Sequence, residues 1–367
     1  MRDLRSTRLS PAYTKRLAAA WSLFVAFYQA RAPLPLESLR KDSVAAVKWM
    51  CLFLQSLYET DRLTKQAVGR HALLSMEKEM KELKGTLQEA WETLESWRQE
   101  IPSQMRVPLF LPALLSMAVV ARLLARSAQG TSGYKWMAAS VLLEVGFFSL
   151  LRPGEMFALT RQLVSLPGQL LGNAAAFAVV GIIGPKNKKQ LGKYQFSVCR
   201  SANATAWLTW FCDGLLPCER LWPGTAKDFR KRFKLLLKYL GLEDLNFSPA
   251  SLRAGGATYL FMHGVDPSRL KFYGRWASER TLAHYLQESV TFQLAHNASA
   301  RAQRLVALAL EVGADFLAPP AQPLSSLFPR PAARKGLAAA VSTDQGLRAP
   351  ALVTPARSWE ALYPPPR

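Results

Sequence analysis

Cysteine is scarce in this sequence, and the few cysteines do not form a metal-site pattern. The four lie at positions 51, 199, 212 and 218, no CxxC pair occurs, and no histidine-rich segment accompanies them. We interpret them as reduced thiols of an intracellular protein. Neither a disulfide framework nor a metal or other cofactor is expected.

Acidic residues are also in short supply. Asp and Glu number 26 against 47 Lys and Arg, which gives a formal net charge of +21 over 367 residues. Such a surface attracts polyanions, so nucleic acid is the first partner to consider and an anionic membrane surface the second. Half of the residues are apolar, enough for a sizeable core, which excludes a chain that is disordered throughout.

Long hydrophobic runs are absent as well. No stretch approaches the ~20 apolar residues that a membrane-spanning helix needs, so no membrane-spanning helix is expected. Nucleic acid stays the first partner, and no membrane partner is predicted. The apolar segment after Lys15 and Arg16 has the length of a buried helix, and its basic lead-in bears a weak similarity to a transit sequence. If the nucleic acid is DNA, the location follows from it: inside the cell with DNA, and in the nucleus if the source is eukaryotic.

Helical periodicity in the first hundred residues predicts a separate domain. Apolar residues recur at three- and four-residue spacing, which predicts helices over about 11–29, 43–59, 62–81 and 86–100. The first of them should start at Ser10, a capping residue followed by Pro11. The proline-bearing stretch 101–108 is the expected boundary. We therefore predict a helical N-terminal domain over residues 1–104.

The rest of the chain mixes helices with strand-like stretches. Helices are predicted over about 111–127, 134–150, 203–214, 226–240, 249–263 and 278–287, with an amphipathic segment over 290–315. The stretches 174–184 and 193–200 flank the polar turn PKNKKQLG and predict an antiparallel hairpin. The fold class is therefore mostly α (α+β), with a second domain over 105–317. After Ala318 periodicity stops, which predicts a disordered, Pro/Ala-rich tail over 318–367.

A tyrosine near the end of the second domain is a candidate nucleophile. The stretch GRWASERTLAHY places Tyr285 nine residues after Trp276. A phenol has a pKa near 10, so it must lose its proton as it attacks a phosphodiester. Arginine forks bind the oxygens that gain charge in the transition state, and a lysine can protonate the leaving oxygen. No metal is needed if cations supply the electrostatics.

The sequence offers these groups in order along the second domain. Arginines at two expected helix starts, Arg152 and Arg253, flank a hairpin that carries Lys186, Lys188 and Lys189. Two glycines follow Arg253 and permit close backbone approach.

This ordered set resembles the tyrosine recombinase (phage integrase) family. The family has an LR-x-x-E-x-x-x-L motif, a hairpin lysine, an arginine in H-x-x-R, and a G-H/W motif with the nucleophile nine residues on. These are matched by Leu151, Arg152, Glu155 and Leu159, by Lys188, by Arg253, and by Trp276 and Tyr285. The tryptophan variant is that of Cre-like members. The resemblance covers about residues 105–300, and the preceding helices are similar to the family's core-binding domain in position and type.

The resemblance implies a site-specific recombinase or integrase of the kind found on mobile elements. Tyr285 would break a DNA strand as a 3′-phosphotyrosyl intermediate, release a 5′-hydroxyl, and rejoin the phosphate to another strand without ATP or metal. Arg152, Lys188, Arg253 and Trp276 would act on the phosphate, with Glu155 holding the first arginine from behind. Double-stranded DNA is the expected partner, clamped between the two domains. A homo-oligomer, a tetramer, would assemble on it through the segment 290–317.

One position departs from the family pattern. Ala250 stands where the family has the histidine of H-x-x-R, to which the resemblance assigns proton handling. General-base assistance is typically worth about 10²–10⁴-fold in rate, so its loss would slow the enzyme. Ser251 and His284 are near in sequence, but nothing in the sequence shows that either replaces it.

Several alternatives therefore stay open. The chain can be a catalytically degenerate DNA-binding protein of the same fold, a type IB topoisomerase-like strand nickase, or a basic surface-binding protein whose motif matches are coincidental. Simpler roles also exist for single residues: Arg152 in a salt bridge with Glu155, Trp276 and Tyr285 in core packing, and any of the three lysines in the site. The basic run over 227–238 is either a solvated face or a phosphate-backbone contact.

Overall fold

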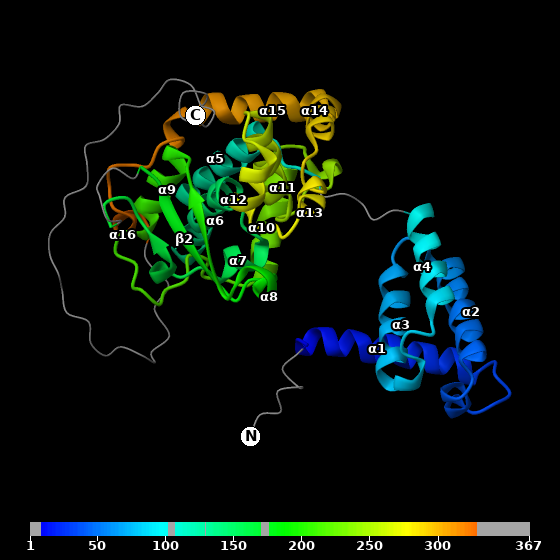
Figure 1. Ribbon diagram of the computed structural model, residues 1–367. Coiled ribbons are helices and arrows are strands. Elements are labelled where there is room, and N and C mark those ends of the chain that lie inside the picture. Colours follow the sequence, from blue (N-terminus) through cyan, green and yellow to red (C-terminus); the bar gives the residue numbers. More distant parts are fainter. Residues whose placement is uncertain (1–8, 102–106, 129, 170–175, 329–367) are drawn as a thin grey trace. The chain divides into compact units, whose positions relative to one another are not determined.

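The computed structural model describes residues 9–101, 107–128, 130–169 and 176–328. Contacts divide the chain into two compact units, Met1–Gln104 and Met105–Arg367, and each is described by itself (Figure 1). No helix in the described ranges has both the length and the apolar character to cross a membrane.

Unit 1 consists of helices packed on one apolar core. They are α1 (Pro11–Gln29), η1 (Leu36–Arg40), α2 (Ser43–Asp61), α3 (Gln66–Glu79), η2 (Lys81–Leu83) and α4 (Gln88–Glu100), η denoting a 3-10 helix. Polar caps begin the first two α-helices: Ser10 Oγ accepts from the Tyr13 N–H (3.3 Å), and Asp42 Oδ1 accepts from the Ala45 N–H (2.9 Å). The four helices expected here and the start at Ser10 are confirmed.

Unit 2 is built around two apolar helices, α5 (Leu111–Ser127) and α6 (Gly130–Phe148), which are buried over most of their length. The helices α9, α10, α11 and α15 pack on this pair (Figure 1). The helical elements that follow α6 are α7 (Pro153–Ala158), η3 (Arg161–Leu163), α8 (Lys188–Leu191), α9 (Ala202–Cys212), α10 (Ala226–Tyr239), η4 (Glu243–Leu245), α11 (Ser251–Met262), α12 (Pro267–Gly274), α13 (Glu279–Ala283), α14 (Glu288–Asn297), α15 (Ala300–Val312), η5 (Ala314–Phe316) and α16 (Leu324–Leu327).

One three-stranded antiparallel sheet completes the described part of unit 2. It has the order β1 (Val164–Ser165), β2 (Ala178–Ile183), β3 (Tyr194–Cys199). Ile183 pairs with Tyr194 and Ala178 with Cys199, so the expected hairpin is confirmed. The turn between these strands contains α8. The strand β1 was not anticipated, because two residues are too few to show a period of two. The fold class, mostly helical with a small antiparallel sheet, is confirmed.

Some element boundaries differ from the sequence prediction. The helix expected over 278–287 ends at Ala283, because the Thr258 hydroxyl of α11 donates to the Tyr285 carbonyl (2.9 Å) and accepts from the Gln287 N–H (3.3 Å). The segment 290–315 is two helices, since the side chain of Ser299 caps a new start at α15. The helix α12, capped by Asp266, was not anticipated.

The prediction of disorder from residue 318 is wrong for the stretch up to residue 328. The helix α16 lies in this stretch, Leu324 and Phe328 are buried, and the Trp210 Nε1–H of α9 donates to the Gln322 carbonyl (2.8 Å). These contacts supply the apolar burial that the composition of the whole tail did not indicate. The remainder of the expected tail, 329–367, lies outside the described residues.

Candidate active site

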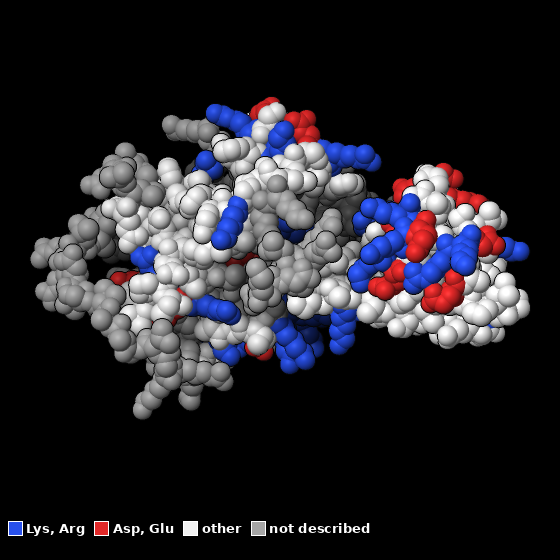
Figure 2. Space-filling view, turned by 60° about the horizontal axis from the view of Figure 1, so that its bottom comes forward, with Lys and Arg blue, Asp and Glu red and all other residues white. Residues whose placement is uncertain are grey.

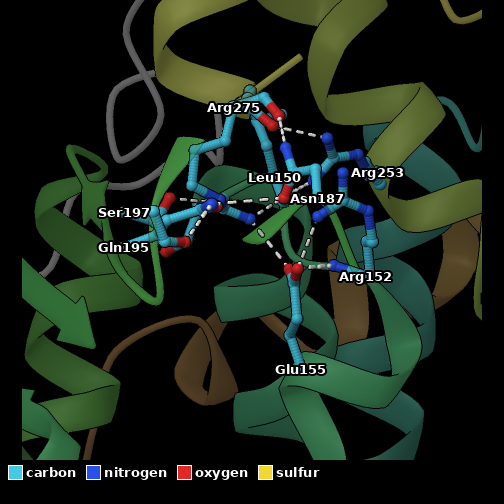
Figure 3. Close-up of polar contacts among 11 residues, drawn as sticks. Leu150, Arg152, Glu155, Asn187, Gln195, Ser197, Arg253 and Arg275 are labelled. Carbon is cyan, nitrogen blue, oxygen red and sulfur yellow. Dashed lines mark hydrogen bonds and ion pairs between the residues drawn. The ribbon is translucent and has the colours of Figure 1, made fainter. Parts of the chain in front are cut away.

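The end of α6 places a carbonyl oxygen between two arginines. The Leu151 N–H bonds to the Gly146 carbonyl (3.0 Å) and the Leu150 N–H to the Phe147 carbonyl (3.2 Å), the pattern of a Schellman cap. Leu150 has a φ of 50°, a left-handed conformation that a leucine adopts only at a cost of about 1–2 kcal/mol. The turned Leu150 carbonyl accepts from Arg253 Nη1 (2.5 Å) and from Arg275 Nη2 (3.4 Å) (Figure 3).

Arg253 is buried within this cluster, with an exposed fraction of 2%. Its other terminal nitrogen, Nη2, donates to the Gly274 carbonyl. The guanidinium lies under the rings of Trp276 (4.2 Å to the centroid) and Tyr285 (5.6 Å). Burial, followed by the charges of two neighbouring arginines, lowers the pKa of Arg253 to about 9, so it stays protonated at neutral pH.

The two glycines after Arg253 bring α11 close to α6 and its neighbours. A Cβ at Gly255 would lie 2.0 Å from the Leu109 carbonyl oxygen, and one at Gly256 would lie 2.1 Å from that of Phe147. The close approach expected from the sequence is therefore confirmed, and it is what places Arg253 beside Leu150.

Glu155 joins two arginines from different elements. Its Oε2 accepts from the Arg152 backbone N–H (2.9 Å) at the start of α7, and its Oε1 accepts from Arg152 Nη1 (2.6 Å). Arg275 Nη2 also donates to Oε2 (2.8 Å) (Figure 3). Burial raises the pKa of Glu155, but Arg275 and Arg152 together outweigh it and hold the pKa below its usual value. Glu155 is therefore an ionised bridge between the arginines.

Arg275 is a site residue that the sequence analysis missed. It lies directly before Trp276 with a φ of 58°, and its exposed fraction is 5%. Its carbonyl accepts from the Asn187 side-chain amide (2.7 Å) in the hairpin turn. Burial lowers its pKa to about 10. The sequence signal for it is its place between Gly274 and Trp276 in the G-H/W motif.

Trp276 and Tyr285 cover the arginines. Their ring centroids are 5.1 Å apart, Trp276 is buried and Tyr285 is half-buried in the turn after α13. Gly274 makes room for the indole, since a Cβ there would lie 1.5 Å from Trp276 Cζ3. The structure thus brings together Arg152, Glu155, Arg253, Trp276 and Tyr285.

The hairpin lysine is the expected site residue that the structure does not place. The backbone of Lys188 begins α8, but the side chains of residues 188 and 189 lie outside the description, and Lys186 is exposed. The hairpin instead reaches the site through Asn187. The position of Ala250 is at the N-cap of α11. Of its sequence neighbours, Ser251 Oγ accepts from the Ser248 N–H (3.1 Å) and His284 is exposed.

The cluster has more hydrogen-bond donors than the described residues satisfy. Its three guanidinium groups and its one carboxylate, that of Glu155, give the cluster a net charge of +2. Buried nitrogens without a partner are Arg253 Nε, Arg275 Nε, Arg275 Nη1 and Trp276 Nε1. Unpaired buried donors are costly, and an anion that enters the site would satisfy them. A phosphate group offers oxygens in the geometry that guanidinium forks bind.

Comparisons with known proteins give one informative likeness. The chain matches no protein-family model and no curated protein. Among solved structures it is similar to the XerH site-specific recombinase bound to a palindromic difH substrate, with a TM-score of 0.51 and 16% identity, over 78% of this chain and 79% of that one. XerA recombinase gives a TM-score of 0.38 and 15% identity, over 76% of this chain and 98% of that one. A Tn1549 transposon integrase in complex with transposon right end DNA gives a TM-score of 0.36 and 13% identity, over 78% of this chain and 97% of that one. At 16% identity the likeness to XerH shows a shared fold.

Proposed function

We propose that this chain is a tyrosine recombinase that binds duplex DNA and breaks and rejoins its strands through Tyr285. The observation that carries the proposal is the buried arginine cluster with unsatisfied N–H donors, whose Arg253 lies under the Tyr285 ring. The fold shared with a site-specific recombinase supports it.

The proposed reaction assigns one task to each group. The phenol of Tyr285 releases its proton to water as its oxygen attacks the phosphorus, the bond to the 5′-oxygen breaks, and the phosphate stays on the tyrosine as a 3′-phosphotyrosyl ester. Arg152, Arg253, Arg275 and the Trp276 N–H stabilise the oxygens that gain negative charge. Lys188 is assigned the proton that the departing 5′-oxygen takes up. Rejoining is the reverse attack by a 5′-hydroxyl, which returns the phenol.

Entry of a phosphate requires a movement of the tyrosine. Arg253 is covered by the Trp276 and Tyr285 rings and donates to two backbone carbonyls through Nη1 and Nη2, and its Nε is buried without a partner among the described residues. Tyr285 lies in a turn rather than in a helix, so a change in that turn would lift the ring and open the cluster. Arg152, whose side chain is 23% exposed, is the arginine that an incoming phosphate meets first.

Covalent capture tests the proposal. The full chain is incubated with a library of nicked duplexes whose short cleaved fragment diffuses away, and DNA that remains bound after denaturation is sequenced. The wild type should give an adduct, and Tyr285→Phe should give none while its duplex affinity stays within a few-fold. The matched control is Tyr273→Phe, because the Tyr273 ring stacks on Arg200. An adduct that persists in Tyr285→Phe would assign the nucleophile to another residue.

A second candidate function is DNA binding without cleavage. The observation in its favour is Ala250, which has no side-chain group that can move a proton. That reading requires duplex binding by the wild type and no adduct with any nicked duplex.

A further inference from the structure

The hairpin turns polar side chains inward and aromatic ones outward. On β3, Gln195 and Ser197 are buried, and they bond to Asn187 (3.2 Å) and to the Ser149 carbonyl. The alternate residues face the other side of the sheet, where Tyr194 and Phe196 are 65% and 66% exposed. A sheet with one buried face normally has the reverse arrangement. Aromatic side chains left in water in this way mark a surface that a partner covers.

The neighbouring strand leaves these two rings accessible. Opposite Tyr194 stands Ile183, which is itself 59% exposed, and opposite Phe196 stands Gly181, which places no side chain beside the ring. Two residues along a strand separate the rings by about 7 Å. Sheets that bind single-stranded nucleic acid use aromatic side chains on strands to stack successive bases.

The charge around the rings identifies the partner. From residue 156 to residue 212 the chain has six Lys and Arg and no Asp or Glu. Lys186, Lys193 and Arg200 are exposed, and Lys193 Nζ lies 5.4 Å from the centroid of the Tyr194 ring. A second copy of this chain would bring like charges together on this face. A nucleic-acid strand supplies phosphates for the cations and bases for the rings.

We propose that Tyr194 and Phe196 form a platform that stacks unpaired bases of a DNA strand. The hairpin that carries the platform also reaches the candidate site, because its Asn187 bonds to the carbonyl of Arg275 (2.7 Å), while the two rings lie on the opposite face of the sheet. The proposal rests on the proposed function for the source of its ligand, a strand released by cleavage at Tyr285. Binding of the strand itself needs no cleavage.

Single-strand affinity tests the platform. The full chain is titrated with an oligothymidine that carries 2-aminopurine, whose fluorescence is quenched by stacking, and with a duplex of equal length. Tyr194→Ala and Phe196→Ala should each weaken single-strand binding about 5- to 100-fold, with a smaller loss on the duplex, and remove the quenching. Phe196→Tyr should retain both. Phe292→Ala removes a ring that is also exposed, at 57%, and should leave both affinities unchanged.

Three results would overturn the platform. The first is that the alanine variants bind the single strand within two-fold of the wild type. The second is that they lose equal affinity for the single strand and for the duplex. The third is a change of sedimentation coefficient in the variants with unchanged oligonucleotide binding, because the face then joins two copies of the chain. Tyr285→Phe separates the two proposals, since it should lose the covalent adduct and keep single-strand binding. If the wild type gives no adduct but Phe196→Ala still loses single-strand affinity, the platform proposal is supported and the strand-cleavage proposal is contradicted.

Discussion

At the scale of single residues, the candidate site depends on groups that hold the arginines as much as on the arginines. The left-handed Leu150 directs its carbonyl to two guanidiniums, and Glu155 bridges Arg152 to Arg275. Sequence motifs located Arg152, Glu155 and Arg253, because each stands at a fixed offset from recognisable neighbours. They did not locate Arg275, because its burial follows from a backbone turn and from contacts with residues more than a hundred positions away.

Glu155→Gln should remove a pH-dependent part of the stability. The folded chain holds the pKa of Glu155 below its usual value, so this contribution is fully present above about pH 4.3. It is lost as the pH falls through the lower folded pKa. At neutral pH the variant should be less stable by roughly 3 kcal/mol, since two arginines lose their counter-charge.

Thermal unfolding of both proteins from neutral to acid pH measures this effect. The difference in Tm between the wild type and Glu155→Gln should shrink as the pH falls below the pKa of an ordinary glutamate, about 4.3. Glu279→Gln is the control, because that carboxylate is exposed and 3.5 Å from Lys271, and it should shift stability by less than about 0.5 kcal/mol. Wild-type and Glu155→Gln curves that stay parallel through the acid range would contradict the bridging role.

Ala250→His tests the one departure from the family pattern. The position caps α11 three residues before Arg253, so an imidazole there would lie within about one helical turn of the cluster. Restored proton handling should raise the rate of adduct formation by part of the roughly 10²–10⁴-fold that general-base assistance supplies. The gain should titrate near a pH of about 6.5. A rate that is flat or lower would mean that another group handles the proton.

At the scale of elements, the C-terminal segment is held by side chains of the unit's central helices. Arg122 of α5, paired with Glu144 of α6, donates to the Phe316 carbonyl (2.7 Å). Asn203 and Trp207 of α9 both donate to the Leu317 carbonyl, at 2.6 and 2.8 Å. The helix α15 packs on α5 of the same chain, whereas α14 has no buried residue. The attachment of the C-terminal segment therefore lies in α15 and in the residues that follow it.

Two tryptophans of α9 provide a matched test of this attachment. Trp207→Phe removes a buried donor to the Leu317 carbonyl and should cost about 1–3 kcal/mol in the free energy of unfolding. Trp210→Phe removes a more exposed donor to the Gln322 carbonyl and should cost about 0.5–1 kcal/mol. Denaturant titration measures both. Equal losses, or no loss in Trp207→Phe, would mean that these bonds do not hold the segment.

Sequence periodicity predicted the long helices and the hairpin, because each has several turns or pairs in which the pattern repeats. It failed at short elements whose ends are set by distant groups. The helix before Tyr285 stops early because Thr258, 27 positions away, takes over the backbone hydrogen bonds. Residues 318–328 are ordered because they pack on α9 and α6, which composition alone does not show.

At the scale of the whole molecule, the charge is distributed unequally between the two units. Residues 105–367 contain 31 Lys and Arg against 14 Asp and Glu, a net charge of +17, while residues 1–104 have 16 against 12. On the face shown in Figure 2, blue groups of unit 2 stand mostly apart from red ones, whereas blue and red alternate on unit 1. A polyanion is therefore attracted mainly to unit 2.

The basic helix α10 is the element where this charge should act on duplex DNA. Its Phe229, Phe233, Leu236 and Leu237 are buried, while Lys227, Arg230, Lys231, Lys234 and Lys238 are exposed. One face anchors the helix and the other presents cations in a row, which is suited to a phosphate backbone. The sequence left this run open between a solvated face and a phosphate contact. Both alternatives require outward cations, so the salt dependence of duplex binding decides between them.

Neutralising two of these lysines tests the contact. Each phosphate contact contributes about 0.9 to the slope of log affinity against log salt. Lys231→Gln combined with Lys234→Gln should therefore reduce the magnitude of that slope by about 1 to 2 and weaken binding in similar proportion across duplex sequences. The control is Arg301→Gln with Arg304→Gln on α15, two exposed residues, which removes the same charge. If the α10 lysines contact phosphates directly, the control should reduce the magnitude of the slope less than the α10 pair does. Equal effects of the two pairs would show that α10 contributes only net charge, and its outward face would then be an ordinary solvated surface.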